Sequence, residues 1–140
     1  MIVLDTNVVS EPTKANLDIR VLQWLDAQEP QTLFLTATSL SELLTGIEQM
    51  PAGKRRTHLR AGVDTLIGKL FGERVLPFDS AAAQQYSRLV TKARAKGCVV
   101  SMGDGQIAAI AASKGFAVAT RDTEPFLAMG LVVINPWTFS

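Results

Sequence analysis

Residues 2–7 are Ile-Val-Leu-Asp-Thr-Asn, in which the short apolar run of residues 2–4 ends directly at the Asp5 carboxylate. Such a run is typical of a buried strand. Similar apolar runs follow at residues 33–35, 75–76, 117–119 and 131–134. Continuously apolar strands that alternate with helical segments are typical of a parallel sheet covered by helices on both faces. The sequence therefore predicts an α/β fold, a three-layer α/β/α sandwich with a mostly parallel five-stranded sheet.

The segments between these strands have apolar residues at helical spacing. In one of them, Leu40, Leu43, Leu44 and Ile47 lie at i, i+3, i+4 and i+7, which places them on one face of a helix. Predicted helices cover approximately residues 16–25, 40–47, 59–70, 80–96, 101–114 and 125–129. The first is expected to begin at an Asn16 cap. Residues 51–56 are expected to form a polar, basic connector.

Length and composition limit the chemistry that is available to the chain. Its 140 residues suit a single domain over residues 1–140, and a hydrophobic content of 47% excludes disorder. Cys98 is the only cysteine and His58 the only histidine, which excludes disulfide frameworks and metal sites built from several such residues. No apolar run approaches the roughly 20 residues of a membrane span, so we expect a cytoplasmic protein without a membrane partner. Any chemistry must then rest on carboxylates.

Acidic residues lie near the strand ends, where ligands bind in open parallel sheets. Asp5 comes directly after the first strand, and Asp122 follows the fourth strand after two intervening residues. Glu42 is expected in the first turn of the helix after the second strand. Asp104 is expected in the first turn of the helix that precedes the fourth strand. We expect the four side chains to share one rim, which for Asp104 requires that its helix begin at that edge.

Each of these acids also has a purely structural interpretation. Glu42 and Asp104 both follow a serine by three residues, the spacing of a capping box at a helix start. Asp122 could cap the turn that follows it, and Asp5 could form an Asx-turn. These roles need no convergence of the four side chains, so their relative positions distinguish the two interpretations.

Convergence of the acids would be costly without a counter-charge. Two carboxylates about 5 Å apart repel each other by roughly 3 kcal/mol at an effective dielectric constant near 20. Three or four together would cost on the order of 10 kcal/mol, which is comparable to the stability of a whole domain. Such a cluster must hold protons or bind a cation. An all-oxygen site suits Mg²⁺ or Mn²⁺, ions that activate water and bind phosphoryl oxygens during phosphodiester hydrolysis.

Several motifs in a fixed order resemble one known family. They are residues 2–7, Ser39–Leu43, Asp104–Ala109 and Ala119–Asp122. Together they resemble the PIN-domain ribonucleases, and among these the VapC/FitB-type toxins of type II toxin–antitoxin pairs. The likeness covers essentially the whole chain, and although each motif alone is weak, the ordered set is specific.

The resemblance implies a PIN-like fold and a toxin that acts as a Mg²⁺- or Mn²⁺-dependent endoribonuclease, cleaving RNA phosphodiester bonds. It implies catalytic and metal-binding roles for Asp5, Glu42, Asp104 and Asp122. The supporting residues that it implies are Thr6 or Thr120, each through its hydroxyl, and Asn7, which would orient Asp5. It also implies a homodimer and a small antitoxin protein that obstructs the acidic pocket.

Basic residues gather in two places that could contact RNA. The first group is Lys54, Arg55 and Arg56 in the expected connector, and the second is Arg88 and Lys92, four residues apart on the expected long helix. Phosphate contacts by these residues would give affinity that is insensitive to base sequence. The alternative is ordinary solvated surface. No aromatic residue lies among them, so base stacking is not supported.

Two rival functions fit parts of the pattern. An aspartate after the first strand is also typical of haloacid-dehalogenase-like phosphatases, but that chemistry needs a second acid two residues later, where Asn7 stands. The chain could also be a catalytically silent PIN-like binding module that keeps its acidic rim for partner recognition. Metal titration together with RNA cleavage assays would separate these possibilities.

Overall fold

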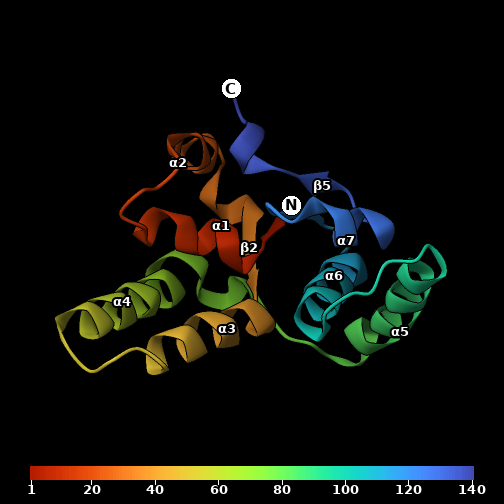
Figure 1. Cartoon of the computed structure of the whole chain (residues 1–140), viewed down its shortest axis with the longest axis horizontal. Coiled ribbons are helices and arrows are strands. Elements are labelled where there is room, and N and C mark those ends of the chain that lie inside the picture. Colours follow the sequence, from red (N-terminus) through yellow and green to blue (C-terminus); the bar gives the residue numbers. More distant parts are fainter.

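The computed structural model describes all residues, 1–140, and contains one five-stranded sheet (Figure 1). Its strands are β1 (Ile2–Leu4), β2 (Leu33–Thr36), β3 (Val75–Leu76), β4 (Ala117–Ala119) and β5 (Val133–Ile134). The order across the sheet is β3-β2-β1-β4-β5, and all neighbouring strands are parallel. The predicted fold class is confirmed. Only β5 is shorter than its apolar run, because residues 131–132 lead the chain in from a turn at Gly130.

Side chains of the central strands alternate between two hydrophobic cores. Val3 faces one core together with its register partners Phe34 and Val118, whereas Leu4 and its partner Ala119 face the other. The first core is covered by α5 (Ser80–Ala95), α6 (Met102–Lys114) and α7 (Thr123–Ala128). The second is covered by α1 (Thr6–Ser10) and α2 (Ile19–Asp26). The sheet is therefore the middle of three layers, as predicted.

Helices α3 (Ala37–Glu48) and α4 (Lys54–Thr65) form a hairpin beside this sandwich, at the lower left of Figure 1. A π-helical segment, Leu66–Phe71, continues α4. The prediction of a basic connector over residues 51–56 is wrong from residue 54 onward, because α4 begins at Lys54 and its Thr57 N–H donates to the Gly53 carbonyl at 3.1 Å. The first turn of α4 contains no apolar residue, so hydrophobic periodicity could not reveal where the helix begins.

Two further local predictions are corrected. Helix α2 begins after Asp18 rather than Asn16, because the Asp18 carboxylate accepts the Arg20 N–H at 3.0 Å and also pairs with the Arg20 guanidinium at 2.7 Å. Helix α1 was not predicted at all.

Short 3₁₀ turns complete the chain at Glu11–Thr13, Pro30–Thr32, Gly72–Arg74 and Pro136–Thr138. None of the helices combines the length and the apolar character that crossing a bilayer would need.

Candidate acidic active site

The carboxyl ends of β1 and β4 bring Asp5 and Thr120 together. Asp5 is the first residue after β1 and caps α1, with its Oδ1 accepting the Thr6 backbone N–H at 2.7 Å. Its Oδ2 accepts a hydrogen bond from the Thr120 hydroxyl, also at 2.7 Å. The residue is only 5% exposed. Both oxygens of this buried carboxylate are therefore held in fixed directions, and its local bond is an N-cap bond to the next residue rather than an Asx-turn.

Glu42 reaches the same region from α3. Helix α3 begins at Ala37 and is capped by Thr36, whose hydroxyl accepts the Ser39 N–H at 3.0 Å. Glu42 therefore lies in the second turn, and the capping-box interpretation of this residue is wrong. Its exposed carboxylate instead accepts a hydrogen bond from the Thr6 hydroxyl at 2.6 Å. Helix α3 starts directly at the end of β2, so Glu42 in its second turn is directed toward α1, where Thr6 lies.

Asp104 lies in the first turn of α6, which begins at the same edge of the sheet. The cap is Ser101, whose hydroxyl accepts the Asp104 N–H at 3.1 Å, so the predicted cap position is confirmed. The preceding residue, Gly103, brings this turn close to α3, since a Cβ atom there would lie 3.1 Å from Glu42 Oε2. Gly105 has a different role, because a Cβ there would lie 2.6 Å from the Tyr86 ring. The two glycines allow α6 to approach both α3 and α5.

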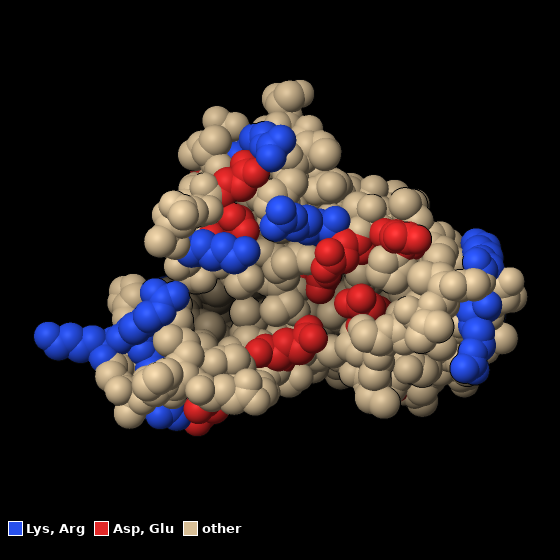
Figure 2. Space-filling view, in the orientation of Figure 1, with Lys and Arg blue, Asp and Glu red and all other residues tan.

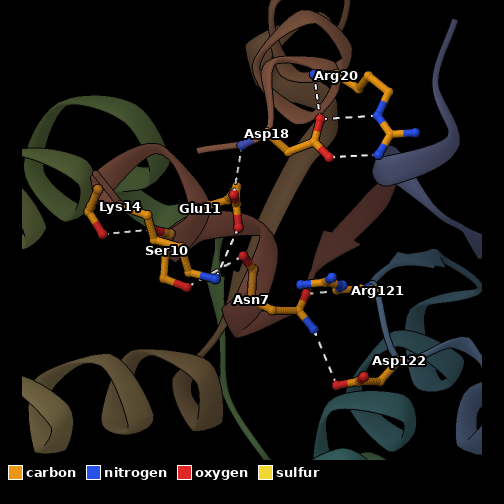
Figure 3. A network of polar contacts seen from close by, with 9 residues as sticks. Asn7, Ser10, Glu11, Lys14, Asp18, Arg20, Arg121 and Asp122 are labelled. Atoms are coloured by element: carbon orange, nitrogen blue, oxygen red, sulfur yellow. Dashed lines mark hydrogen bonds and ion pairs between the residues drawn. The ribbon is translucent and has the colours of Figure 1, made fainter. Parts of the chain in front are cut away.

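Asp122 completes the group from the segment after β4 (Figure 3). It occupies the cap position of α7, but its carboxylate makes no capping hydrogen bond. Its backbone N–H donates to the Thr120 hydroxyl oxygen at 3.0 Å. The Asn7 amide nitrogen lies 3.5 Å from both Asp122 Oδ2 and that same hydroxyl oxygen. Asn7 therefore adjoins Asp122 and Thr120, and it is linked to Asp5 through the Thr120 hydroxyl.

Burial dominates the electrostatics of Asp5. Its pKa is raised from the usual 3.8 to about 6, chiefly because the carboxylate is removed from water. Hydrogen bonds from Thr120 and Thr6 oppose this rise, and the negative charges of Asp104 and Glu42 add to it. Repulsion between the acids is therefore present but secondary to desolvation.

The ionisation of Asp104 is also affected by neighbouring acids. Its pKa is also raised, first by burial and then by the charges of Asp122 and Glu42, while Ser101 opposes the rise. Glu42, Asp104 and Asp122 thus each raise the pKa of at least one other acid of the group. Figure 2 shows the acidic side chains gathered across the centre of this face. The structure brings together all four predicted acids, which come from four separate segments.

The four carboxylates fit a hard divalent cation in their chemistry. They offer oxygen atoms alone, the ligands that Mg²⁺ and Mn²⁺ prefer. No three Asp, Glu, His or Cys side chains stand close enough to form a ready metal site. Asp5 and Glu42 are each hydrogen-bonded to a threonine hydroxyl. Glu42 and Asp122 are exposed, and Glu42 would have to leave the Thr6 hydroxyl to turn toward Asp5 and Asp104.

Among the predicted RNA-contact residues, only Arg56 is paired with a carboxylate. Lys54 and Arg55 are exposed on α4, and Arg56 pairs with Glu48 at 2.8 Å. Arg88 and Lys92 are exposed on α5, where no carboxylate pairs with them. Figure 2 shows a strip of basic side chains along the right edge, where α5 lies in Figure 1. Contact of any of these residues with RNA stays a prediction.

An apolar groove opens beside the acidic group, between α1 and the α3–α4 hairpin. Its volume is about 680 Å³, and its rim includes Thr6 and Glu42. The apolar side chains that line it are Val9, Leu43, Ile47, Met50, Leu59, Val63 and Leu66. The groove therefore adjoins the site directly.

Sequence reasoning missed one basic residue at the rim of the site. Arg121 stands between Thr120 and Asp122, and its guanidinium carbon lies 5.5 Å from the centre of the Trp137 ring. Figure 3 places Arg121 next to Asn7, whose side-chain oxygen is 3.4 Å from the Arg121 backbone nitrogen. The position within the Thr120–Asp122 motif was the available signal, whereas contact with Trp137 needs the tertiary fold.

Comparison with known proteins agrees with this geometry. The PIN domain family model matches residues 2–130. The VapC ribonuclease Y4jK of Sinorhizobium fredii is 50% identical over 137 residues, which cover 98% of each chain. Toxin FitB of Neisseria gonorrhoeae is 39% identical over 98% of this chain and 99% of its own. The crystal structure of FitAcB from Neisseria gonorrhoeae superposes with a TM-score of 0.94 at 38% identity, covering 99% of this chain and 100% of that one.

The family match spans strands β1 to β4 and all four segments that supply the acids. The full-length relatives show that the likeness is not confined to a motif. The resemblance found in the sequence is therefore confirmed, and the phosphatase alternative is not favoured. This chain belongs to the PIN-domain family, with VapC- and FitB-type toxins among its relatives.

Proposed function

We propose that the protein is a divalent-metal-dependent endoribonuclease that serves as the toxin of a toxin–antitoxin pair. The observation that carries this proposal is the gathering of carboxylates from four separate segments at the carboxyl edge of the sheet, where neighbouring acids help to raise the pKa of Asp5 and Asp104. The names VapC ribonuclease and Toxin FitB, carried by full-length relatives, support the same activity. The substrate class is RNA, which places its action in the cytoplasm.

Asp5 and Asp104 are the proposed principal holders of the ion, Mg²⁺ or Mn²⁺. Both carboxylates are at least partly removed from water, so a cation relieves the cost of ionising them. Glu42 and Asp122 complete the oxygen ligand set. When bound, the ion supplies activation of water and stabilisation of charge on the phosphoryl oxygens.

The neighbouring polar groups position these carboxylates. Thr120 and the Thr6 N–H fix the two oxygens of Asp5. The Thr6 hydroxyl holds Glu42, and the Asn7 amide lies beside Asp122. These supporting residues keep each acid near the others without an added charge.

Two protein partners complete the proposal. A small antitoxin would occupy the apolar groove that opens on Glu42 and Thr6, which would obstruct the acidic site. The chain would assemble as a homodimer, as the family resemblance implies. Co-expression with the product of a neighbouring small reading frame should restore growth and yield a co-purified complex. Growth arrest that no such product relieves would count against the toxin–antitoxin role.

Cleavage of RNA by the purified chain tests the enzymatic part. We expect cleavage with Mg²⁺ or Mn²⁺, none with a chelator, and at least a hundredfold loss in Glu42→Gln. Glu48→Gln is the matched control, because Glu48 is also an exposed acid of α3 but pairs with Arg56 instead. Equal activity of Glu42→Gln and the wild type would contradict the proposed site. Ion binding without any RNA cleavage would favour the silent binding module.

A further inference from the structure

Arg121 lies in the chain between two residues of the acidic site. It follows Thr120, which bonds Asp5, and precedes Asp122. Its side chain is exposed, and Figure 3 shows it beside Asn7. An RNA strand that reached the acids would therefore pass close to this side chain.

The guanidinium of Arg121 has no carboxylate partner. No carboxylate oxygen lies within 4.0 Å of it, whereas two nearby cations are already paired: Lys14 with Glu11 at 3.1 Å and Arg20 with Asp18 at 2.7 Å. A guanidinium carries five N–H donors. Those of Arg121 are available to a ligand, in contrast to the donors of the paired cations.

The guanidinium of Arg121 lies over the ring of Trp137. The indole is buried, with the residue 7% exposed, and lies in the Pro136–Thr138 turn, which Asn135 caps through the Trp137 N–H at 3.0 Å. The guanidinium carbon stands 5.5 Å from the ring centre, within the range of a cation–π interaction. A side chain oriented in advance loses less entropy when it binds.

We propose that Arg121 binds a phosphate of the RNA next to the one that is cleaved, with Trp137 positioning its guanidinium. This inference rests on the proposed ribonuclease function. A planar guanidinium donates two parallel hydrogen bonds to a phosphate, which lysine cannot do. A fixed cation also offsets the repulsion between the acidic group and the RNA backbone, so the rim needs such a charge.

A purely structural role for Arg121 makes a different prediction. The pKa of Glu11 is lowered, first by the Asp18 N–H and in smaller part by Lys14 and Arg121. If shielding of Glu11 were the whole role of Arg121, its removal would lower the melting temperature and leave RNA affinity unchanged.

Binding of a fluorescein-labelled 12-nucleotide single-stranded RNA tests the proposal, measured by anisotropy in the Glu42→Gln background with Mg²⁺. We expect Arg121→Gln to bind roughly tenfold more weakly. The slope of log affinity against log salt concentration should fall by about 0.7, the value for one phosphate contact on a single strand. Arg121→Lys should keep the slope and still bind RNA several-fold more weakly. The RNA affinity of Trp137→Phe should lie between those of Arg121→Lys and the parent protein.

Lys114→Gln is the charge-matched control. Lys114 is exposed at the far end of α6, about 18 Å along the helix from its first residue, so its removal should change neither affinity nor slope. An unchanged slope in Arg121→Gln, or an equal loss in Lys114→Gln, would overturn the proposal. In the active background, Arg121→Gln should raise KM with little change in kcat. If the wild type binds RNA but does not cleave it, the ribonuclease proposal fails, while the slope still decides whether Arg121 binds phosphate.

Discussion

Replacing Asp5 by asparagine tests whether the acidic site strains the ion-free fold. The pKa of Asp5 is raised from 3.8 to about 6, first by burial and then by neighbouring Asp104 and Glu42, against the hydrogen bonds that lower it. A carboxyl with a higher pKa in the folded state is more stable there when protonated. Its contribution to stability is therefore complete below pH 3.8 and is lost as the pH rises through 6.

The size of this effect follows from the shift. A rise of about two pH units corresponds to roughly 3 kcal/mol between the acidic and alkaline limits. About 1.4 kcal/mol of it falls between pH 5 and pH 8, because the unfolded carboxyl is already ionised at pH 5. The asparagine side chain of the Asp5→Asn variant cannot ionise, so the variant should gain this amount relative to wild type over that range. A constant loss of about 1 kcal/mol accompanies it, because the Thr120 hydroxyl loses a charged acceptor.

Thermal unfolding in chelator at pH 5 and pH 8 measures this difference. For a chain of this size, 1.4 kcal/mol corresponds to a relative rise of roughly 5 °C in the melting temperature of Asp5→Asn. Asp18→Asn is the control, because the pKa of Asp18 is lowered to about 2 by Arg20, chiefly through its side-chain hydrogen bond. Asp18 is therefore ionised in both states at both pH values, and its variant should differ from wild type equally at each. A pH-independent difference for Asp5→Asn, or one of opposite sign, would refute the reasoning.

Three more outcomes are expected. Gly105→Ala should cost about 1–3 kcal/mol of stability, because its Cβ would lie 2.6 Å from the Tyr86 ring; a melt that matches that of Gly46→Ala, whose Cβ meets no atom within 4 Å, would contradict this. Thr6→Val should reduce RNA cleavage by about tenfold at an almost unchanged melting temperature, since it removes the hydroxyl that holds Glu42, and Thr6→Ser should restore the rate. Mg²⁺ should raise the wild-type melting temperature more at pH 8 than at pH 5, because its ligands must be ionised; an equal rise at both values would argue for binding elsewhere.

Much of the architecture follows from local apolar runs. The strand at residues 2–4 is buried by covering helices on both faces, so its sequence is uninterrupted by polar residues, and the same holds for the strand at 117–119. Strand ends then locate Asp5 and Asp122, because the carboxyl ends of parallel strands share an edge. The Ser101 cap marked the start of α6 in the sequence, whereas the edge of the sheet at which α6 begins, and so the position of Asp104, is known only from the structure.

The remaining features depend on tertiary structure or on segments too short to show a period. Helix α1 has five residues, of which Val8 and Val9 alone are buried, so no periodicity could mark it. Glu42 lies on the predicted helix and at the predicted edge of the sheet. The predicted start of that helix was wrong, because Thr36 rather than Ser39 provides the cap. The contact of Arg121 with Trp137 joins the ends of two strands and has no local signature.

A crystal structure of the protein soaked with Mn²⁺, solved with its anomalous signal, tests the central claim most directly. We predict a manganese peak at the carboxyl edge of the sheet, with Asp5 and Asp104 oxygens within about 2.3 Å of it and Glu42 or Asp122 turned toward it. A peak bound only by residues outside this group, or no peak at saturating Mn²⁺, would contradict the account.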